Sequence, residues 1–104
     1  MISRQWAGVL KAKHAEEYMQ HLKEELFPKL SSISGFCGAS ILRKDMEDAV
    51  EFLIITNWES MEAIRKFAGE NPDLAVVPEE VQRMALQYDK QVRHYEVAYS
   101  YPDK

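Results

Sequence analysis

The chain has 104 residues, 46% of them hydrophobic and 29% charged, which is typical of one globular domain and excludes a disordered or fibrous chain. Its 13 basic and 17 acidic residues give a net charge of −4, so we expect no nucleic-acid partner and no attachment to an anionic membrane. The single cysteine excludes an intrachain disulfide and a cysteine-based zinc site. With no membrane-length apolar run and no signal-peptide core, the sequence predicts a cytoplasmic protein, folded as one domain over residues 1–104.

The first predicted element is a strand over residues 2–10. Side chains alternate along it, with Arg4 and Trp6 on one face and Gln5 on the other. Apolar residues occur on both faces, which indicates that both faces are covered.

A helix is predicted next, over residues 13–27, where apolar side chains recur at helical spacing. Pro28 should end or kink this helix. His14 and His21 flank the apolar stripe without joining it, and seven residues of helix separate them by about 10 Å, too far to share a metal ion. We therefore expect two solvated histidines.

Two strands joined by a polar turn at 45–48 follow, over residues 36–44 and 49–58, and predict an antiparallel hairpin. In the second of these strands Trp58 belongs to one face and Asn57 to the other.

The remainder predicts two short helices and a final strand. Ser60 is a good cap for a helix that carries Phe67 and stops at Gly69. Pro78 opens a third helix whose apolar stripe extends to Tyr88, and the last strand runs over about 91–99.

The predicted order is β-α-β-β-α-α-β, which indicates a ferredoxin-like α+β sandwich with a four-stranded antiparallel sheet and helices on one face. Helices on one face leave the other face of these two-sided strands uncovered. A two-fold homodimer covers that face without a second gene product, so we expect the chain to be its own partner.

Several strings resemble a known family: Pro28-Lys29-Leu30, Gly35-Phe36, Thr56-Asn57-Trp58-Glu59-Ser60, Phe67-Ala68-Gly69, Ala75-Val76-Val77-Pro78 and Val92-Arg93-His94-Tyr95-Glu96-Val97. Together they make the chain, from Ile2 to about Tyr99, similar to the antibiotic biosynthesis monooxygenase (ABM) family. The resemblance implies a dimeric α+β barrel in which two ferredoxin-like sheets pack face to face. It implies less about activity, because the family includes cofactor-free monooxygenases of aromatic polyketides, haem-degrading enzymes and members with no assigned reaction.

The haem-degrading branch of the resemblance requires three residues that this chain lacks. It needs a Trp on the inner face of the second helix, where Phe67 stands here. It needs a His after that helix, and none occurs between His21 and His94. It also needs an Asn on the first strand, which has Arg4, Gln5 and Trp6 instead. We therefore expect no haem degradation.

His94 is the candidate catalytic residue, as a proton acceptor or polar anchor in the pocket between sheet and helices. The alternative is a hydrogen-bonded structural histidine.

The candidate substrate pocket consists of Trp6, Trp58 and Phe67 as aromatic walls, with Asn57 and Arg4 as donors to a ligand carbonyl or oxyanion. The alternatives are core or interface packing for the aromatic residues and strand-end positions for the polar ones. No phosphate loop, dinucleotide fingerprint or metal-ligand spacing occurs, so no cofactor and no metal are expected.

Two functions remain open from the sequence. The first is a cofactor-independent monooxygenase acting on a small aromatic or polyphenolic compound, with the substrate supplying the electrons to oxygen. The second is a non-catalytic dimeric protein that binds a small ligand in the same pocket. An apolar cavity without convergent donors would favour the second.

Overall fold

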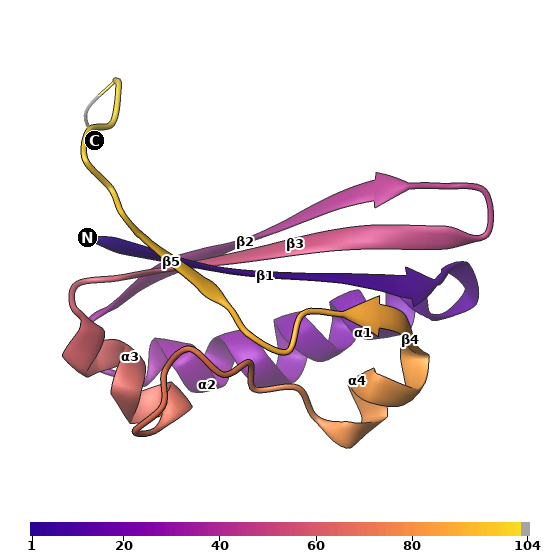
Figure 1. Ribbon diagram of the computed structural model, residues 1–104, viewed down its shortest axis with the longest axis horizontal. Coiled ribbons are helices and arrows are strands. Elements are labelled where there is room, and N and C mark those ends of the chain that lie inside the picture. The colour runs from indigo at the N-terminus through magenta and orange to yellow at the C-terminus, as the bar shows by residue number, and fades with distance from the viewer. Residues whose placement is uncertain (103–104) are drawn as a thin grey trace.

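The computed structural model describes residues 1–102, which form one antiparallel sheet with helices packed on one of its faces (Figure 1). In these residues the sheet has the order β2-β3-β1-β4, and a fifth strand, β5, also pairs with β1. Its strands are β1 (Ile2–Lys11), β2 (Phe36–Asp45), β3 (Ala49–Trp58), β4 (Ala85–Tyr88) and β5 (Arg93–Glu96). This arrangement confirms the ferredoxin-like α+β class.

The predicted third helix is too long and the predicted four-stranded sheet has one strand too few. Helix α4 (Glu79–Met84) ends where β4 begins, so Tyr88 lies in a strand opposite Gly8 and not on a helix. Pairing with the free edge of β1 outweighs the helical spacing of the side chains. The strand pairing along this edge of β1 is interrupted at Asp89, whose carbonyl accepts a hydrogen bond from Trp6 Nε1 at 2.9 Å. Beyond this point β5 pairs with β1 again.

The long helix continues past Pro28, so the expectation that proline ends it is wrong. It comprises a short 3₁₀ turn, α1 (Ala15–His21), a π-helical turn at Leu22–Leu26 and α2 (Phe27–Ser31). Proline in a regular α-helix clashes with the carbonyl four residues earlier. The wider π turn, in which the Phe27 N–H bonds the Leu22 carbonyl, lets the helix continue.

The hairpin of β2 and β3 and the second helix agree with prediction. Helix α3 (Met61–Ala68) is capped by Ser60, whose Oγ accepts from the Ala63 N–H at 3.2 Å, and it ends at Gly69. Gly35, before β2, has a φ of +98°, and a Cβ on it would lie only 2.6 Å from the Ala63 Cβ. The glycine therefore permits both the turn and the close approach of α3.

Two apolar clusters form the core on the helix side of the sheet. One contains Leu10, Tyr18 and Phe52, and the other contains Leu30, Trp58 and Ile64. The opposite face of the sheet is uncovered and includes apolar side chains, Leu42 being 45% exposed. Within residues 1–102 no helix is long and apolar enough to cross a membrane.

Candidate functional site

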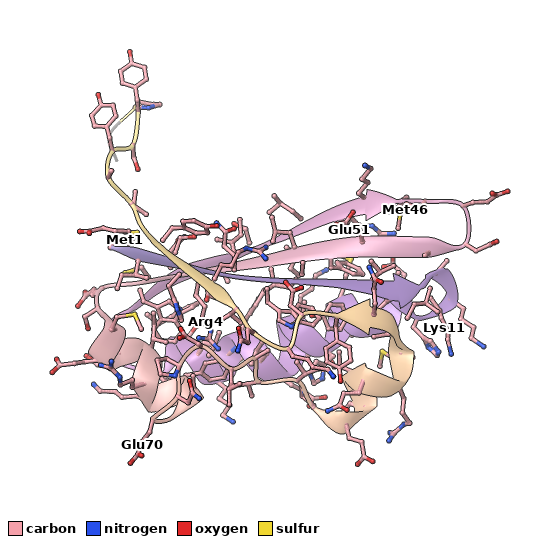
Figure 2. The ribbon with its side chains drawn as sticks, in the orientation of Figure 1. Met1, Arg4, Lys11, Met46, Glu51 and Glu70 are labelled. Carbon is pink, nitrogen blue, oxygen red and sulfur yellow. The ribbon has the colours of Figure 1, made fainter. Side chains whose placement is uncertain are left out.

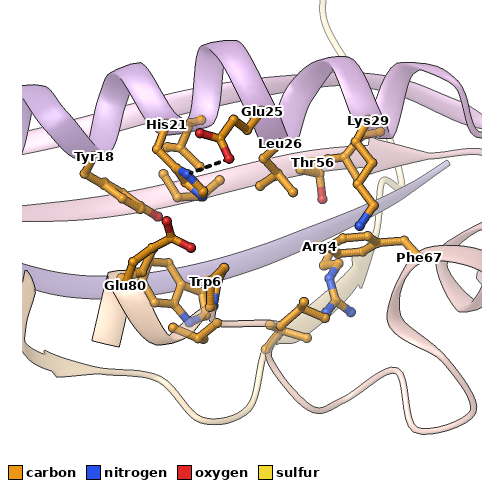
Figure 3. Close-up of a pocket in the computed structure, with 18 residues that line it drawn as sticks. Arg4, Trp6, Tyr18, His21, Glu25, Leu26, Lys29, Thr56, Phe67 and Glu80 are labelled. Carbon is orange, nitrogen blue, oxygen red and sulfur yellow. Dashed lines mark ion pairs between the residues drawn. The ribbon is translucent and has the colours of Figure 1, made fainter. Parts of the chain in front are cut away.

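A cavity of about 340 Å³ lies between the sheet and the long helix, and side chains from β1, β3, α3, α4 and the segment before α4 complete its wall (Figure 3). Its volume is in the range of small-molecule sites. Aromatic, aliphatic and polar side chains line it, among them Arg4, Trp6, Tyr18, His21, Glu25, Leu26, Lys29, Thr56, Phe67, Val77 and Glu80.

Arg4 supplies a buried positive charge to this cavity. The residue is only 5% exposed and lies on the helix side of the sheet (Figure 2). Its guanidinium donates to the carbonyls of Pro72 and Leu74 at 2.5 and 3.2 Å, and no carboxylate in residues 1–102 forms an ion pair with it. Burial lowers the pKa of Arg4 to about 10, opposed by the charge of Asp73, so the group remains cationic at neutral pH.

His94 lies behind Arg4 and is not among the side chains that line the cavity. Its Nε2 lies 3.0 Å from Arg4 Nη1, and its Nδ1 lies 3.4 Å from Asp73 Oδ1. An arginine N–H can only donate, so Nε2 is the acceptor and Nδ1 carries the proton. Burial, together with the charge of Arg4, lowers the pKa of His94 below 6.5 and favours the neutral ring. These contacts favour the alternative of a hydrogen-bonded histidine that positions Arg4.

The aromatic residues of the candidate pocket are only partly brought together. Trp6 and Phe67 line the cavity, and the Arg4 guanidinium carbon lies 5.7 Å from the centre of the Phe67 ring. Trp58 does not line it, contrary to prediction. Its ring is fully buried behind Phe67, with ring centres 6.2 Å apart, and its Nε1 donates to Thr56 Oγ1 at 2.8 Å. Trp58 therefore supports the wall from behind.

Asn57 lies on the uncovered face of the sheet, so the prediction that it lines the pocket is wrong for this cavity. Strand alternation is the cause: Thr56 and Trp58 are buried on the helix side, and the residue between them points the other way.

The sequence prediction missed the polar side chains that the long helix contributes. His21 was expected in solvent, but its side chain is 14% exposed and lines the cavity, with Nδ1 3.6 Å from Glu25 Oε1. His14, at 28% exposed, pairs with Glu17 outside the cavity. A signal was present, because His21, Glu25 and Lys29 recur every four residues and so share one helix face.

Among residues 1–102 no group of three or more His, Cys, Asp or Glu side chains is placed to hold a metal ion. The polar groups that converge on the cavity are suited to an organic ligand: a cation at Arg4, a hydroxyl at Tyr18 and an imidazole at His21. Burial of Tyr18 raises the pKa of its hydroxyl above the usual range, so it stays protonated and can donate.

Comparison with known proteins finds both a family and a shared fold. A structure from Bacillus cereus, described as a candidate antibiotic biosynthesis monooxygenase, is 21% identical with a TM-score of 0.66, covering 95% of this chain and 94% of the other. An arginine-to-serine variant of MhuD with two manganese protoporphyrin IX molecules bound per active site is 20% identical with a TM-score of 0.68, covering 96% and 97%. The haem-degrader MhuD of Mycobacterium tuberculosis, with two haems in its active site, is 18% identical with a TM-score of 0.62, covering 94% and 97%.

At these identities the structures show a common fold. No curated protein matches the chain. The family model for antibiotic biosynthesis monooxygenases matches residues 9–84, which is most of the chain. The protein therefore belongs to the antibiotic biosynthesis monooxygenase family.

Proposed function

We propose that the protein is a cofactor-independent monooxygenase that oxidises a small aromatic or polyphenolic compound bound as its anion. The observation that supports this most directly is the guanidinium of Arg4, which is buried at the wall of a largely apolar cavity and forms no ion pair with a carboxylate among residues 1–102. Family membership makes oxygenation the reaction class to test first.

A buried cation next to aromatic rings favours an anion that is itself flat and aromatic. Charges attract one another more strongly where water is excluded, so Arg4 stabilises a phenolate or enolate oxygen in the cavity. The rings of Trp6 and Phe67 offer faces against which a flat ligand can pack.

The proposed oxidation needs only the substrate and molecular oxygen. Removal of one proton from an activated CH₂ group leaves an enolate-like anion. Its electron pair forms a C–O bond to O₂, and protonation of the distal oxygen gives a hydroperoxide. Loss of the second C–H proton then forms C=O, breaks the O–O bond and releases water. The substrate carbon supplies all four electrons, and the protein holds the ring, stabilises the anion and limits access of water.

A second copy of the chain is part of the proposal. The uncovered sheet face carries Leu42, Leu53 and Ile55, which are half-buried or exposed in the isolated chain. An isologous dimer that packs these faces together removes them from water.

The polar side chains that line the cavity favour an enzyme over the alternative, a protein that only binds a ligand. An apolar cavity without convergent polar groups would have favoured binding alone. Here Arg4, Tyr18 and His21 reach the same cavity from β1 and the long helix.

The test is oxygen consumption with a panel of hydroquinones, naphthols and anthrones, combined with Arg4→Met and Arg4→Lys variants. Loss of a charged oxyanion donor typically lowers turnover by about 10²–10³-fold. We expect that loss in Arg4→Met and a partial loss in Arg4→Lys, which keeps the charge but not the planar donors. If no panel member is bound or oxidised, or if Arg4→Met turns substrate over like the wild type, the proposed function is wrong.

A further inference from the structure

A histidine of the long helix, His21, lines the cavity, and membership of the family gives it no role. His21 comes from the last turn of α1, immediately before the π-helical turn. Its side chain is 14% exposed, whereas the Glu25 side chain is 69% exposed. The imidazole thus stands at the cavity wall, and its carboxylate partner lies at the rim in contact with solvent.

The carboxylate of Glu25 determines which ring nitrogen of His21 carries the proton. Glu25 Oε1 lies 3.6 Å from Nδ1, too long for a direct hydrogen bond but close enough for an ion pair (Figure 3). A carboxylate at this side favours the tautomer with the proton on Nδ1, and it stabilises the imidazolium that forms when Nε2 takes a second proton. Nε2 is therefore the nitrogen left to accept a proton from a ligand.

The cavity has two chemically different ends. Figure 3 shows Arg4 and Lys29 beside Phe67 at one end, and His21 with Tyr18 and Glu80 toward the other. A bound aromatic can then place its oxygen against Arg4 while an acidic C–H or O–H faces His21. An anion-stabilising group and a base on opposite sides of one substrate is the arrangement that proton abstraction next to a carbonyl requires.

We infer that His21, oriented by Glu25, is the proton acceptor of this site, and that the substrate is an aromatic compound whose acidic hydrogen must be removed before it reacts with oxygen. The inference rests on the proposed function. In the step, the substrate C–H or O–H bond breaks, the proton moves to Nε2, and its electron pair stays on the substrate as the anion that Arg4 stabilises. The same proton returns when the imidazolium protonates the peroxide formed with O₂. His21 therefore ends the cycle neutral.

The other ionisable groups at the cavity serve this role less well. Tyr18 stays protonated because burial raises the pKa of its hydroxyl. Both ring nitrogens of His94 are engaged with Arg4 and Asp73, away from the cavity wall. Glu80 is exposed, and a solvated carboxylate is a weaker base than an imidazole.

The experiment compares His21→Gln with His14→Gln. Both residues lie on the same helical segment and pair with a glutamate one turn on, but only His21 reaches the cavity. Each variant is assayed with two compounds of similar shape: an anthrone-type substrate that is neutral at the assay pH and carries an activated CH₂ group, and a nitrophenol-type analogue that is already ionised and is used for binding alone. We expect His21→Gln to lower kcat on the neutral substrate by about 10²–10⁴-fold, the usual contribution of a positioned base, and to change binding of the ionised analogue less than threefold. His14→Gln should match the wild type.

Glu25→Gln is the test of orientation. We expect Glu25→Gln to lower kcat on the neutral substrate, by less than His21→Gln does, and to leave KM unchanged; a kcat equal to that of the wild type would show that Glu25 does not orient the ring. Unchanged melting temperatures of the variants confirm that they are folded.

The outcomes separate the inference from the function on which it rests. If the ionised analogue binds in an Arg4-dependent manner and the wild type oxidises the neutral substrate, but His21→Gln oxidises that substrate like the wild type, the assignment of His21 is overturned and the proposed function stands. If neither compound binds to the wild type, the proposed function itself fails.

Discussion

Replacement of His94 by phenylalanine distinguishes a positioning role from a catalytic one. The His94 Nε2 accepts a hydrogen bond from the Arg4 guanidinium at 3.0 Å, and Nδ1 faces Asp73 at 3.4 Å. Phenylalanine keeps most of the ring volume and removes both nitrogens. The guanidinium then has a buried N–H without its partner.

The expected loss of stability follows from these contacts. A hydrogen bond to a charged group contributes about 1.5–3 kcal/mol. Arg4 keeps its bonds to the Pro72 and Leu74 carbonyls, and the Asp73 side chain, 70% exposed, returns to water at little cost. We therefore expect His94→Phe to lower the free energy of unfolding by about 1–2 kcal/mol, or about 4–8 °C in Tm for each kcal/mol in a domain of this size.

The pH dependence gives a second signature. Burial and the charge of Arg4 lower the pKa of His94 from 6.5 in the folded protein. The unfolded chain therefore binds more protons at this residue, and the stability it contributes falls as the pH drops below 6.5 towards the lower pKa of the folded state. The gap in stability between wild type and His94→Phe should be larger at pH 7.5 than at pH 5.5.

Urea denaturation at both pH values measures these effects, with His14→Phe as the control on a half-buried histidine outside the cavity, for which we expect a change under about 0.5 kcal/mol. Because His94→Phe holds Arg4 less firmly, we expect this variant to raise KM for an anionic substrate more than it lowers kcat. Identical urea midpoints for wild type, His94→Phe and His14→Phe would refute the positioning role. A loss of turnover of about 10²-fold or more with unchanged stability would establish the catalytic role instead.

Three further predictions concern the fold, the assembly and haem. Gly35→Ala should destabilise the protein by about 1–2 kcal/mol more than Gly69→Ala, because both have positive φ but only the first new methyl meets Ala63; equal losses in urea denaturation would contradict this. Sedimentation should show a dimer at micromolar concentration, burying about 1,600 Å² or more, and Leu53→Lys should dissociate it; a stable wild-type monomer would contradict the barrel. Haem should not be degraded under reducing conditions, because the family resemblance puts Phe67 where the haem-degrading members need a Trp; a stoichiometric Soret complex that decays with iron release would show otherwise.

The parts of the fold that the sequence predicts well are those set by local pattern. Alternation along 49–58 places Trp58 and Asn57 on opposite faces, as observed, but it does not tell which of the two faces is buried. Ser60 caps α3, because a hydroxyl next to free backbone N–H groups acts over only three residues. Where long-range pairing decides, the pattern fails. Tyr88 has helical spacing from Val81 and Met84, yet it pairs with Gly8, which no local rule reveals.

The site shows the same division between local and distant causes. His14 and His21 look alike in sequence, since each flanks the apolar stripe and has a glutamate one turn on. What separates them is the cavity, which His21 lines together with Val76, Val77 and Pro78 from the segment before α4, and which His14 does not reach. The cavity wall brings together residues distant in sequence, and the π-helical turn after His21 adds a local change that apolar spacing does not report. The segment before α4, distant in sequence, therefore helps to form the cavity that makes His21, and not His14, the candidate base.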